Sequence, residues 1–229
     1  MEKKKLIFCA LDFTNLEESI NFTNKIKNHI GGVKLGLEFF TKNGPNGVEK
    51  IKKIGLPIFL DLKFHDIPNT VKQSIKNVLD LLPDYITVHL SGGYQMIKEL
   101  NDIKRKTKII GVSMLTSLDD KDLKNMGVNF GKQNFINNLV KIGVKAGIDG
   151  IVCSPKEVKY LKKSYKNLIF VTPGIRLPTE NRDDQKRVES PKFAVKAGSD
   201  ILVIGRSITK SKNPVNTLKK IVQNINDEK

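Results

Sequence analysis

The sequence of 229 residues is poor in cysteine and has no apolar run long enough to cross a membrane. Its two cysteines, Cys9 and Cys153, each stand inside a short apolar stretch, so we expect buried free thiols rather than a disulfide or a metal site. The first apolar run, residues 6–11, is too short for the apolar segment of a secretory signal and is followed by the charged Asp12. These absences favour a globular protein of the reducing cytoplasm, with no membrane partner.

The chain also lacks linkers and low-complexity tracts, and its length fits one β/α barrel, which usually takes about 200 to 250 residues. We therefore expect a single domain over residues 1–229, and a hydrophobic fraction of 39% is enough to give it one core. Short apolar runs alternate with amphipathic stretches, which is typical of repeated βα units around a parallel sheet. The eight expected strands are residues 6–11, 33–37, 58–62, 85–89, 109–114, 150–153, 168–172 and 201–204.

Apolar residues with helical spacing mark the segments between the expected strands. Two such stripes are Val71, Ile75, Val78, Leu79 and Leu82, and Leu218, Ile221, Val222 and Ile225. Ser154 and Ser190 are each followed by proline, a pattern that predicts a helix start. A doubly wound open sheet is the alternative, but residues 12–15 lack the glycine-rich turn that binds phosphate in that fold. The sequence therefore predicts an α/β protein with a (β/α)8 barrel, the TIM-barrel fold.

Positive charge exceeds negative charge, since 40 lysine and arginine residues outnumber 24 aspartate and glutamate residues and give a formal net charge of +16. Such a balance attracts anions, whether phosphates, nucleic acids or acidic membranes. Many lysines lie singly or in pairs along expected helices, which is typical of solvated helix faces. A barrel that binds nucleic acid is one alternative, although it gives no reason for acidic residues facing the barrel mouth.

Charged residues lie around the ends of the first three expected strands, and the strand ends carry the chemistry in a β/α barrel. They are Asp12, Lys34, Asp61, Lys63 and Asp66. Asp61 and Lys63 are two residues apart in one strand, so alternation places both side chains toward the barrel mouth. A simple ion pair would explain these two, and Asp66 could cap the helix that begins near Pro68. Two carboxylates and two lysines converging on one site instead favour function, because each buried charge needs opposite charges around it.

This set of charges suits the loss of a carboxylate group from a substrate. Lys63 could act as a general acid and protonate a strongly basic carbanion. Asp61 beside a substrate carboxylate would repel it and so favour a transition state in which that charge has left the carboxylate.

A phosphate site is expected beyond strands seven and eight, where barrels usually hold this group. Gly174 and Gly205 let the backbone approach a phosphate closely, and Arg176, Gln185 and Arg206 supply donors around it. A surface salt bridge is the other explanation for Arg206. The polar segment 174–189 could close over the phosphate, or it could be an ordinary surface loop.

One continuous motif carries a specific resemblance to a known family. Residues 59–70 read Phe-Leu-Asp-Leu-Lys-Phe-His-Asp-Ile-Pro-Asn-Thr, and this segment resembles the signature of orotidine 5′-monophosphate decarboxylase. The resemblance extends over nearly the whole chain, through residues 10–12, Lys34, 89–93, 115–117, 172–176, Gln185 and 204–206. Leu90 departs from it, being bulkier than the small residue expected at that position.

The resemblance implies that a homodimer converts orotidine 5′-monophosphate to UMP without a metal or an organic cofactor. It implies a catalytic tetrad of Lys34, Asp61, Lys63 and Asp66, in which Lys63 is the proton donor. Asp66, Ile67 and Thr70 would reach the site across the dimer interface. The implied substrate contacts are Asp12, Lys34, Asp61, Ile67, Thr70, Thr116, Arg176, Gln185, Gly205 and Arg206.

A magnesium-dependent sugar-phosphate decarboxylase or aldolase of the same superfamily is the nearest alternative, because it shares an Asp-x-Lys-x-x-Asp motif. Its metal site uses a carboxylate at the end of strand two, where this chain has Lys34, and a lysine there would repel a divalent cation. His65 and His89 are expected to be hydrogen-bond partners of the charged residues rather than metal ligands or catalytic groups. We therefore expect no metal site.

Overall fold

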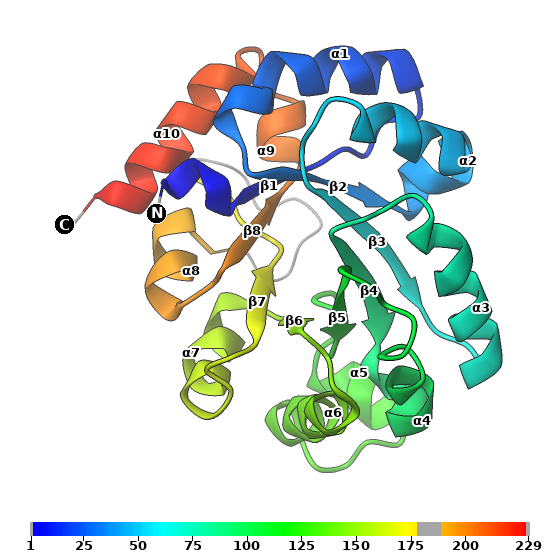
Figure 1. The fold of residues 1–229 in the computed structure, drawn as a ribbon. Helices are drawn as coiled ribbons and strands as arrows, with labels where there is room; N and C mark the ends of the chain where they lie inside the picture. Colours follow the sequence, from blue (N-terminus) through cyan, green and yellow to red (C-terminus); the bar gives the residue numbers. More distant parts are fainter. Residues whose placement is uncertain (1, 178–188, 228–229) are drawn as a thin grey trace.

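Eight parallel strands close into a barrel in the order of the sequence, in a computed structural model that describes residues 2–177 and 189–227 (Figure 1). Each strand pairs with the next one along the chain, and the last strand pairs with the first. The strands are β1 (Ile7–Ala10), β2 (Gly32–Gly36), β3 (Ile58–Phe64), β4 (Tyr85–His89), β5 (Lys108–Val112), β6 (Gly150–Val152), β7 (Ile169–Thr172) and β8 (Ile201–Ile204). The predicted α/β barrel is therefore confirmed.

Several strand boundaries differ from the prediction by one or two residues. Leu6 lies in a short 3-10 helix, η1 (Lys3–Leu6), rather than in β1, and Leu37 begins helix α2 (Leu37–Lys52). β5 ends at Val112, two residues before the predicted end. β3 instead continues to Phe64, and its pairing register with β4 shifts along the way.

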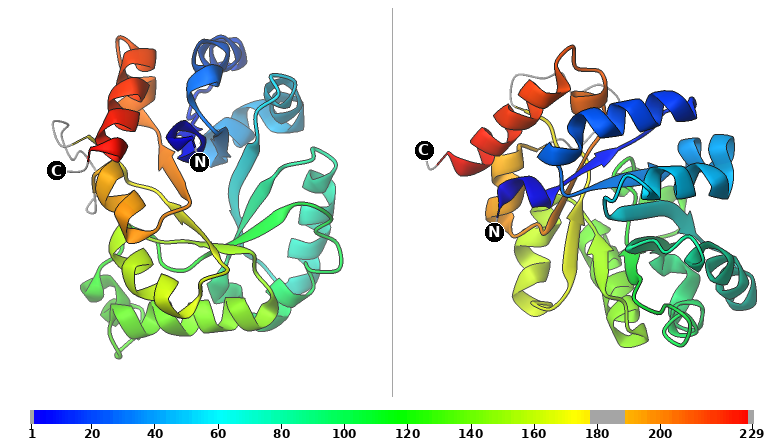
Figure 2. Two further views of the ribbon diagram at one scale, coloured as in Figure 1. Left: turned by 60° about the vertical axis from the view of Figure 1, so that its left-hand side comes forward. Right: turned by 45° about the horizontal axis from the view of Figure 1, so that its top comes forward.

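Helices surround the barrel and follow one another around it in chain order (Figures 1 and 2). Besides η1 and α2 they are α1 (Leu16–Ile26), η2 (Lys27–His29), α3 (Pro68–Leu79), η3 (Leu90–Gly92), α4 (Gly93–Lys98), α5 (Asp120–Asn125), α6 (Lys132–Ala146), α7 (Pro155–Ser164), α8 (Pro191–Ala197), α9 (Arg206–Thr209) and α10 (Pro214–Asn226). Both predicted helix starts are confirmed: Ser154 and Glu157 form a capping box before α7, and Ser190 Oγ accepts a hydrogen bond from Phe193 N–H before α8. Within residues 2–177 and 189–227, none of the helices combines the length and the apolar character that a membrane span needs.

Two apolar layers build the core of the protein. The larger layer lies between strands and helices and includes the free thiols of Cys9 and Cys153, both buried as predicted. The smaller layer fills the barrel, where the ring of Tyr85 meets those of Phe8 and Phe59 at centroid distances of 5.7 and 5.9 Å. These three aromatic residues stand near the starts of their strands, so one end of the barrel is filled and polar side chains can gather at the other.

The predicted apolar stripes of α3 and α10 face the core, with one exception. The buried members are Val71, Ile75, Val78 and Leu79 in α3, and Leu218, Ile221 and Ile225 in α10, while Val222 is partly buried. Leu82 was wrongly included, because it lies beyond the end of α3 and is 62% exposed. Pro83 follows it, and a residue before proline disfavours the helical conformation.

Three aspartates tie neighbouring strands together at the filled end of the barrel. Asp149, just before β6, accepts a hydrogen bond from Ile109 N–H at 2.9 Å and pairs with Lys104 at 2.8 Å. Burial alone would raise the pKa of Asp149, but these hydrogen bonds and the neighbouring lysine charges outweigh it and hold the pKa below its usual 3.8. Asp84 and Asp200 accept backbone hydrogen bonds from the starts of β3 and β7 in the same way.

Candidate active site

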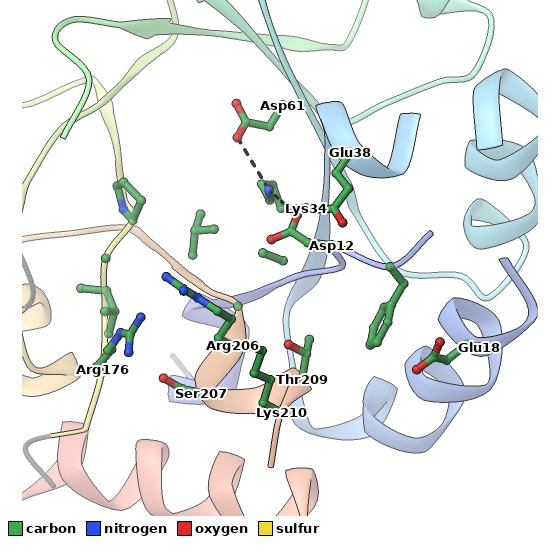
Figure 3. A pocket seen from close by; sticks show the side chains of 17 residues that line it. Asp12, Glu18, Lys34, Glu38, Asp61, Arg176, Arg206, Ser207, Thr209 and Lys210 are labelled. Atoms are coloured by element: carbon green, nitrogen blue, oxygen red, sulfur yellow. Dashed lines mark hydrogen bonds and ion pairs between the residues drawn. The ribbon is translucent and has the colours of Figure 1, made fainter. Parts of the chain in front are cut away.

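The C-terminal ends of the strands open into two adjoining cavities, one of about 800 Å³ and one of about 140 Å³. Asp61, Pro173 and Val203 line both of them, so the two spaces meet near the ends of β3, β7 and β8. Figure 3 shows the larger cavity with the side chains around it. This position matches the end of the barrel at which the sequence places its charged residues.

Four of the five predicted charged residues form one chain of alternating charge, here called the ion-pair chain: Asp12, Lys34, Asp61 and Lys63. Lys34 Nζ lies 3.1 Å from Asp12 Oδ1 and 3.9 Å from Asp61 Oδ2 (Figure 3). The same Asp61 oxygen lies 2.9 Å from Lys63 Nζ. The side chains of Lys34 and Asp61 are each only 13% exposed, so these opposite charges offset much of the cost of leaving water.

A bulge at the end of β3 sets the position of Lys63. The pairing register with β4 shifts between Leu60 and Phe64, so residues 61–63 face Thr87 alone. Lys63 has φ 50, a left-handed backbone conformation that is uncommon for any residue except glycine. The predicted pairing of Lys63 with its neighbouring aspartate is present, but a bulge rather than regular strand alternation produces it.

Two uncharged residues that the sequence analysis missed contact the ion-pair chain. Thr87 Oγ1 donates a hydrogen bond to Asp61 Oδ1 at 2.9 Å and accepts one from Lys63 N–H at 2.8 Å. At Gly36, the last residue of β2, an added Cβ would lie 2.7 Å from Lys34 Nζ. A glycine inside a strand often marks such a close approach and could have pointed to Gly36, whereas a threonine in a strand is too ordinary to single out.

The segment between β3 and α3 and the first turn of α3 line neither cavity of their own chain. Asp66, Ile67 and Thr70 are exposed, Ile67 to 67%, and none of them lines either cavity. Asp66 does not cap α3, because Ile67 occupies the N-cap position and makes no side-chain cap. Asp66 Oδ1 instead accepts a hydrogen bond from Ile67 N–H at 2.7 Å. The capping explanation for Asp66 is therefore wrong, and in the described part of the chain this residue lies outside the ion-pair chain.

The smaller cavity has a mostly apolar wall. Five strands contribute to it the side chains of Phe59, Val112, Val152, Val171 and Val203. Its polar members include Thr116, Asp61 and Lys63. A flat apolar ring can therefore be held here with its edge turned to the ion-pair chain.

The larger cavity carries two arginines at a distance from Asp61 (Figure 3). Arg176 follows β7 and is 8% exposed, and Arg206 is the first residue of α9. Gly205, the N-cap of α9, lines the same cavity, and so does Lys210, which the sequence analysis did not consider. Gln185 lies outside the described residues, as does the stretch 178–188 of the segment predicted to close over a phosphate.

The rings of His65 and His89 are neighbours with centroids 5.3 Å apart and planes tilted by 41°. Burial lowers the pKa of His89 below its usual 6.5, and the charges of His65 and Lys63 lower it further against the opposing effect of the Asp61 charge. In residues 2–177 and 189–227, no group of three or more histidine, cysteine, aspartate or glutamate side chains is placed to hold a metal ion. Among the described residues of the site, lysine and arginine side chains carry the positive charge.

Three comparisons relate the chain to known proteins. Residues 5–221 match the family described as orotidine 5′-phosphate decarboxylase / HUMPS. The chain is 44% identical over 209 residues to the orotidine 5′-phosphate decarboxylase of Sphingopyxis alaskensis, which covers 91% of this chain and 93% of that protein. It is 42% identical over 224 residues to the enzyme of the same name from Wolbachia pipientis, covering 96% and 99% of the two chains.

Among solved structures, the crystal structure of orotidine 5′-phosphate decarboxylase from Lactobacillus acidophilus is similar, with a TM-score of 0.84 and 34% sequence identity. The match covers 96% of this chain and 99% of that one. Fold and sequence therefore agree along almost the whole length. This chain belongs to the orotidine 5′-phosphate decarboxylase / HUMPS family.

Proposed function

We infer that this protein decarboxylates orotidine 5′-monophosphate to UMP, a reaction of pyrimidine nucleotide biosynthesis. The observation that carries this conclusion is the ion-pair chain, which stands between a small apolar cavity and a larger cavity with two arginines. The two relatives compared above, whose alignments cover 91% and 96% of this chain, are both named orotidine 5′-phosphate decarboxylase.

The two cavities suggest how the substrate lies. The pyrimidine ring occupies the apolar cavity with its edge toward Thr116, and the ribose hydroxyls meet Asp12 and Lys34, which line the larger cavity. The phosphate is held by Arg176 and Arg206, whose guanidinium groups suit two-point contacts with phosphate oxygens. Gly205 allows the backbone to come close, and Gln185 adds a further donor.

The ion-pair chain supplies the chemistry at C6 of the pyrimidine. Asp61 lies beside the substrate carboxylate and repels it, and this repulsion is relieved in the transition state as the negative charge moves from the carboxylate toward C6. The C6–carboxyl bond breaks, carbon dioxide leaves, and the electron pair stays on C6. Lys63 Nζ, held 2.9 Å from Asp61 Oδ2, gives its proton to that carbanion and so forms UMP. Lys34 offsets the negative charge of Asp61 and Asp12.

A homodimer completes the site in this proposal. Asp66, Ile67 and Thr70 are exposed and line neither cavity of their own chain, and an exposed isoleucine beside an exposed carboxylate suits an interface that delivers both to a neighbouring site. In a two-fold dimer each chain gives these residues and receives them in return. The partner's Asp66 is then the fourth member of the tetrad with Lys34, Asp61 and Lys63.

No metal or organic cofactor enters this mechanism. The magnesium-dependent alternative needs a cation at the end of β2, where Lys34 places its own positive charge between two carboxylates. Binding of nucleic acid is not favoured either, because the acidic side chains at the barrel mouth would repel a phosphate backbone. We place the reaction in the cytoplasm, where the free thiols of Cys9 and Cys153 stay reduced.

Turnover of a carboxyl-labelled substrate tests this function. The purified protein is incubated with orotidine 5′-monophosphate labelled in the carboxyl group, and labelled carbon dioxide and UMP are measured together. We expect equal amounts of the two products, and no turnover by Lys63→Ala. A folded wild-type protein that releases no carbon dioxide would contradict the proposed function.

A further inference from the structure

The bulge in β3 leaves a backbone N–H at the centre of the site in need of an acceptor. Leu60 pairs with Ile86 and Phe64 pairs with Val88, so three residues of β3 face one residue of β4. Such a bulge interrupts the regular ladder of hydrogen bonds between strands. The N–H of Lys63 lies in this interrupted stretch and donates to a side chain instead, at 2.8 Å.

The acceptor is Thr87, which is completely buried. A backbone N–H can only donate, so Thr87 Oγ1 must be the acceptor in this contact. The single hydroxyl proton then goes to Asp61 Oδ1 at 2.9 Å, since a carboxylate only accepts. One hydroxyl group thereby joins the backbone of Lys63 to the carboxylate of Asp61.

The two carboxylate oxygens of Asp61 therefore have different partners. Oδ1 is held by Thr87, and Oδ2 faces both ammonium groups, at 2.9 Å from Lys63 Nζ and 3.9 Å from Lys34 Nζ. The hydrogen bond to Oδ1 therefore orients the carboxylate from Thr87, which lines neither cavity. The hydrogen bond from Lys63 N–H to Thr87 Oγ1 also stabilises the left-handed backbone conformation of Lys63, which has φ 50.

We propose that Thr87 is a positioning residue for the decarboxylation, because its hydroxyl fixes the Asp61 carboxylate and the Lys63 backbone relative to each other. The inference rests on the proposed function of the site. Thr87 itself lines neither cavity, so it acts through Asp61 and Lys63 rather than by touching the substrate.

Two matched pairs of variants at Thr87 isolate the effect of the hydroxyl group. Thr87→Val keeps the shape of the side chain and removes the hydroxyl, and Thr87→Ser keeps the hydroxyl and removes the methyl group. Serine and alanine form a second pair, so Thr87→Ala against Thr87→Ser decides the question if the valine variant does not fold. For each folded variant we would measure kcat with orotidine 5′-monophosphate, the affinity for UMP and the melting temperature.

The hydroxyl should control the chemical step rather than binding. We expect kcat to fall about 10- to 100-fold in Thr87→Val, the usual effect of losing a hydrogen bond to a charged group, and to stay within about threefold in Thr87→Ser. Affinity for UMP should change by no more than about twofold in either variant, because the product has no carboxylate beside Asp61.

Three results would overturn the inference or its basis. Equal kcat values for the valine and serine variants, or for the alanine and serine variants, would show that the hydroxyl does not position the site. A parallel loss of kcat and UMP affinity would show general damage instead. A folded wild-type protein that does not convert orotidine 5′-monophosphate would refute the proposed function itself, which is a separate failure from an active wild type with unresponsive variants.

Discussion

Gly36→Ala changes the ion-pair chain without touching a charged residue. The added Cβ would lie 2.7 Å from Lys34 Nζ and 3.6 Å from Asp12 Oδ1. An unstrained contact between nonbonded atoms of this kind needs about 3.4 Å or more, so the ammonium group must retreat by about 0.7 Å. Lys34 Nζ is the far end of a flexible side chain and can move, but it then leaves its position between Asp12 and Asp61.

The effect on activity should be much larger than the effect on stability. A misplacement of about 1 Å in an active site can cost about 100-fold in rate, so we expect kcat/KM to fall about 10- to 100-fold. Gly36 has φ −95 and ψ −172, which alanine adopts freely, and alanine stabilises such a position by about 0.4 to 1 kcal/mol through the unfolded chain. Gly36 is also the N-cap of α2, where alanine is worse than glycine by a similar amount. The net change in unfolding free energy should stay within about 1 kcal/mol.

Steady-state kinetics and urea unfolding of the same preparation measure both quantities. Lys34→Ala provides the control, because without the ammonium group the added methyl group has nothing to displace. In that background Gly36→Ala should have no further effect on UMP affinity. Full activity of Gly36→Ala, or a loss of activity matched by a loss of folded protein, would refute the reasoning.

Three further predictions concern the phosphate end, the dimer and the filled end of the barrel. Arg206→Ala should lower kcat/KM for orotidine 5′-monophosphate roughly 100-fold or more but barely affect orotidine, which has no phosphate, and equal losses on both substrates would exclude a phosphate role. Lys63→Ala and Asp66→Ala should each be nearly inactive alone, yet unfolding and refolding an equal mixture together should restore about one quarter of the active sites in a two-fold dimer. A mixture with proven hybrids that stays inactive would show that Asp66 serves its own chain. Asp149 has a lowered pKa, so its contribution to stability is present above pH 3.8 and is lost as the pH falls below it. Urea unfolding of wild type and Asp149→Asn should therefore differ at pH 6 and converge at acid pH, and a pH-independent difference would contradict this reasoning.

The fold could be predicted from the sequence because its signals are periodic. Eight apolar runs gave eight strands, and the stripes of α3 and α10 gave the helix faces that cover them. The prediction for Leu82 failed because hydrophobicity at helical spacing does not show where a helix ends, and α3 ends at Leu79, three residues earlier. The observed strand ends differ from the predicted ones for a similar reason, because hydrophobicity does not show where the hydrogen-bonded pairing between two strands stops.

Four of the five charged residues could be placed together from the sequence, because charged side chains at the ends of apolar strands are unusual. The bulge that brings Lys63 to its partner could not be predicted, because a bulge depends on the register between two strands rather than on either sequence. Thr87 and Gly36 were missed for a related reason: one acts through a hydroxyl from the neighbouring strand and the other through the absence of a side chain.

Asp66 shows the limit of reasoning from one chain. Its charge and its place after β3 marked it as functional, but its own chain leaves it exposed and outside the ion-pair chain. The role proposed for it depends on a second copy. Sequence motifs can indicate such a residue without showing which subunit it serves.

The most direct test of the account is the rate of UMP formation from orotidine 5′-monophosphate, measured by absorbance with and without a metal chelator. We expect rapid conversion at the same rate in both conditions, because Lys34, Asp61 and Lys63 carry the charges that the reaction needs and Lys34 opposes a bound cation. Absence of conversion, or abolition by the chelator with recovery on adding magnesium, would contradict the account and favour the sugar-phosphate alternative.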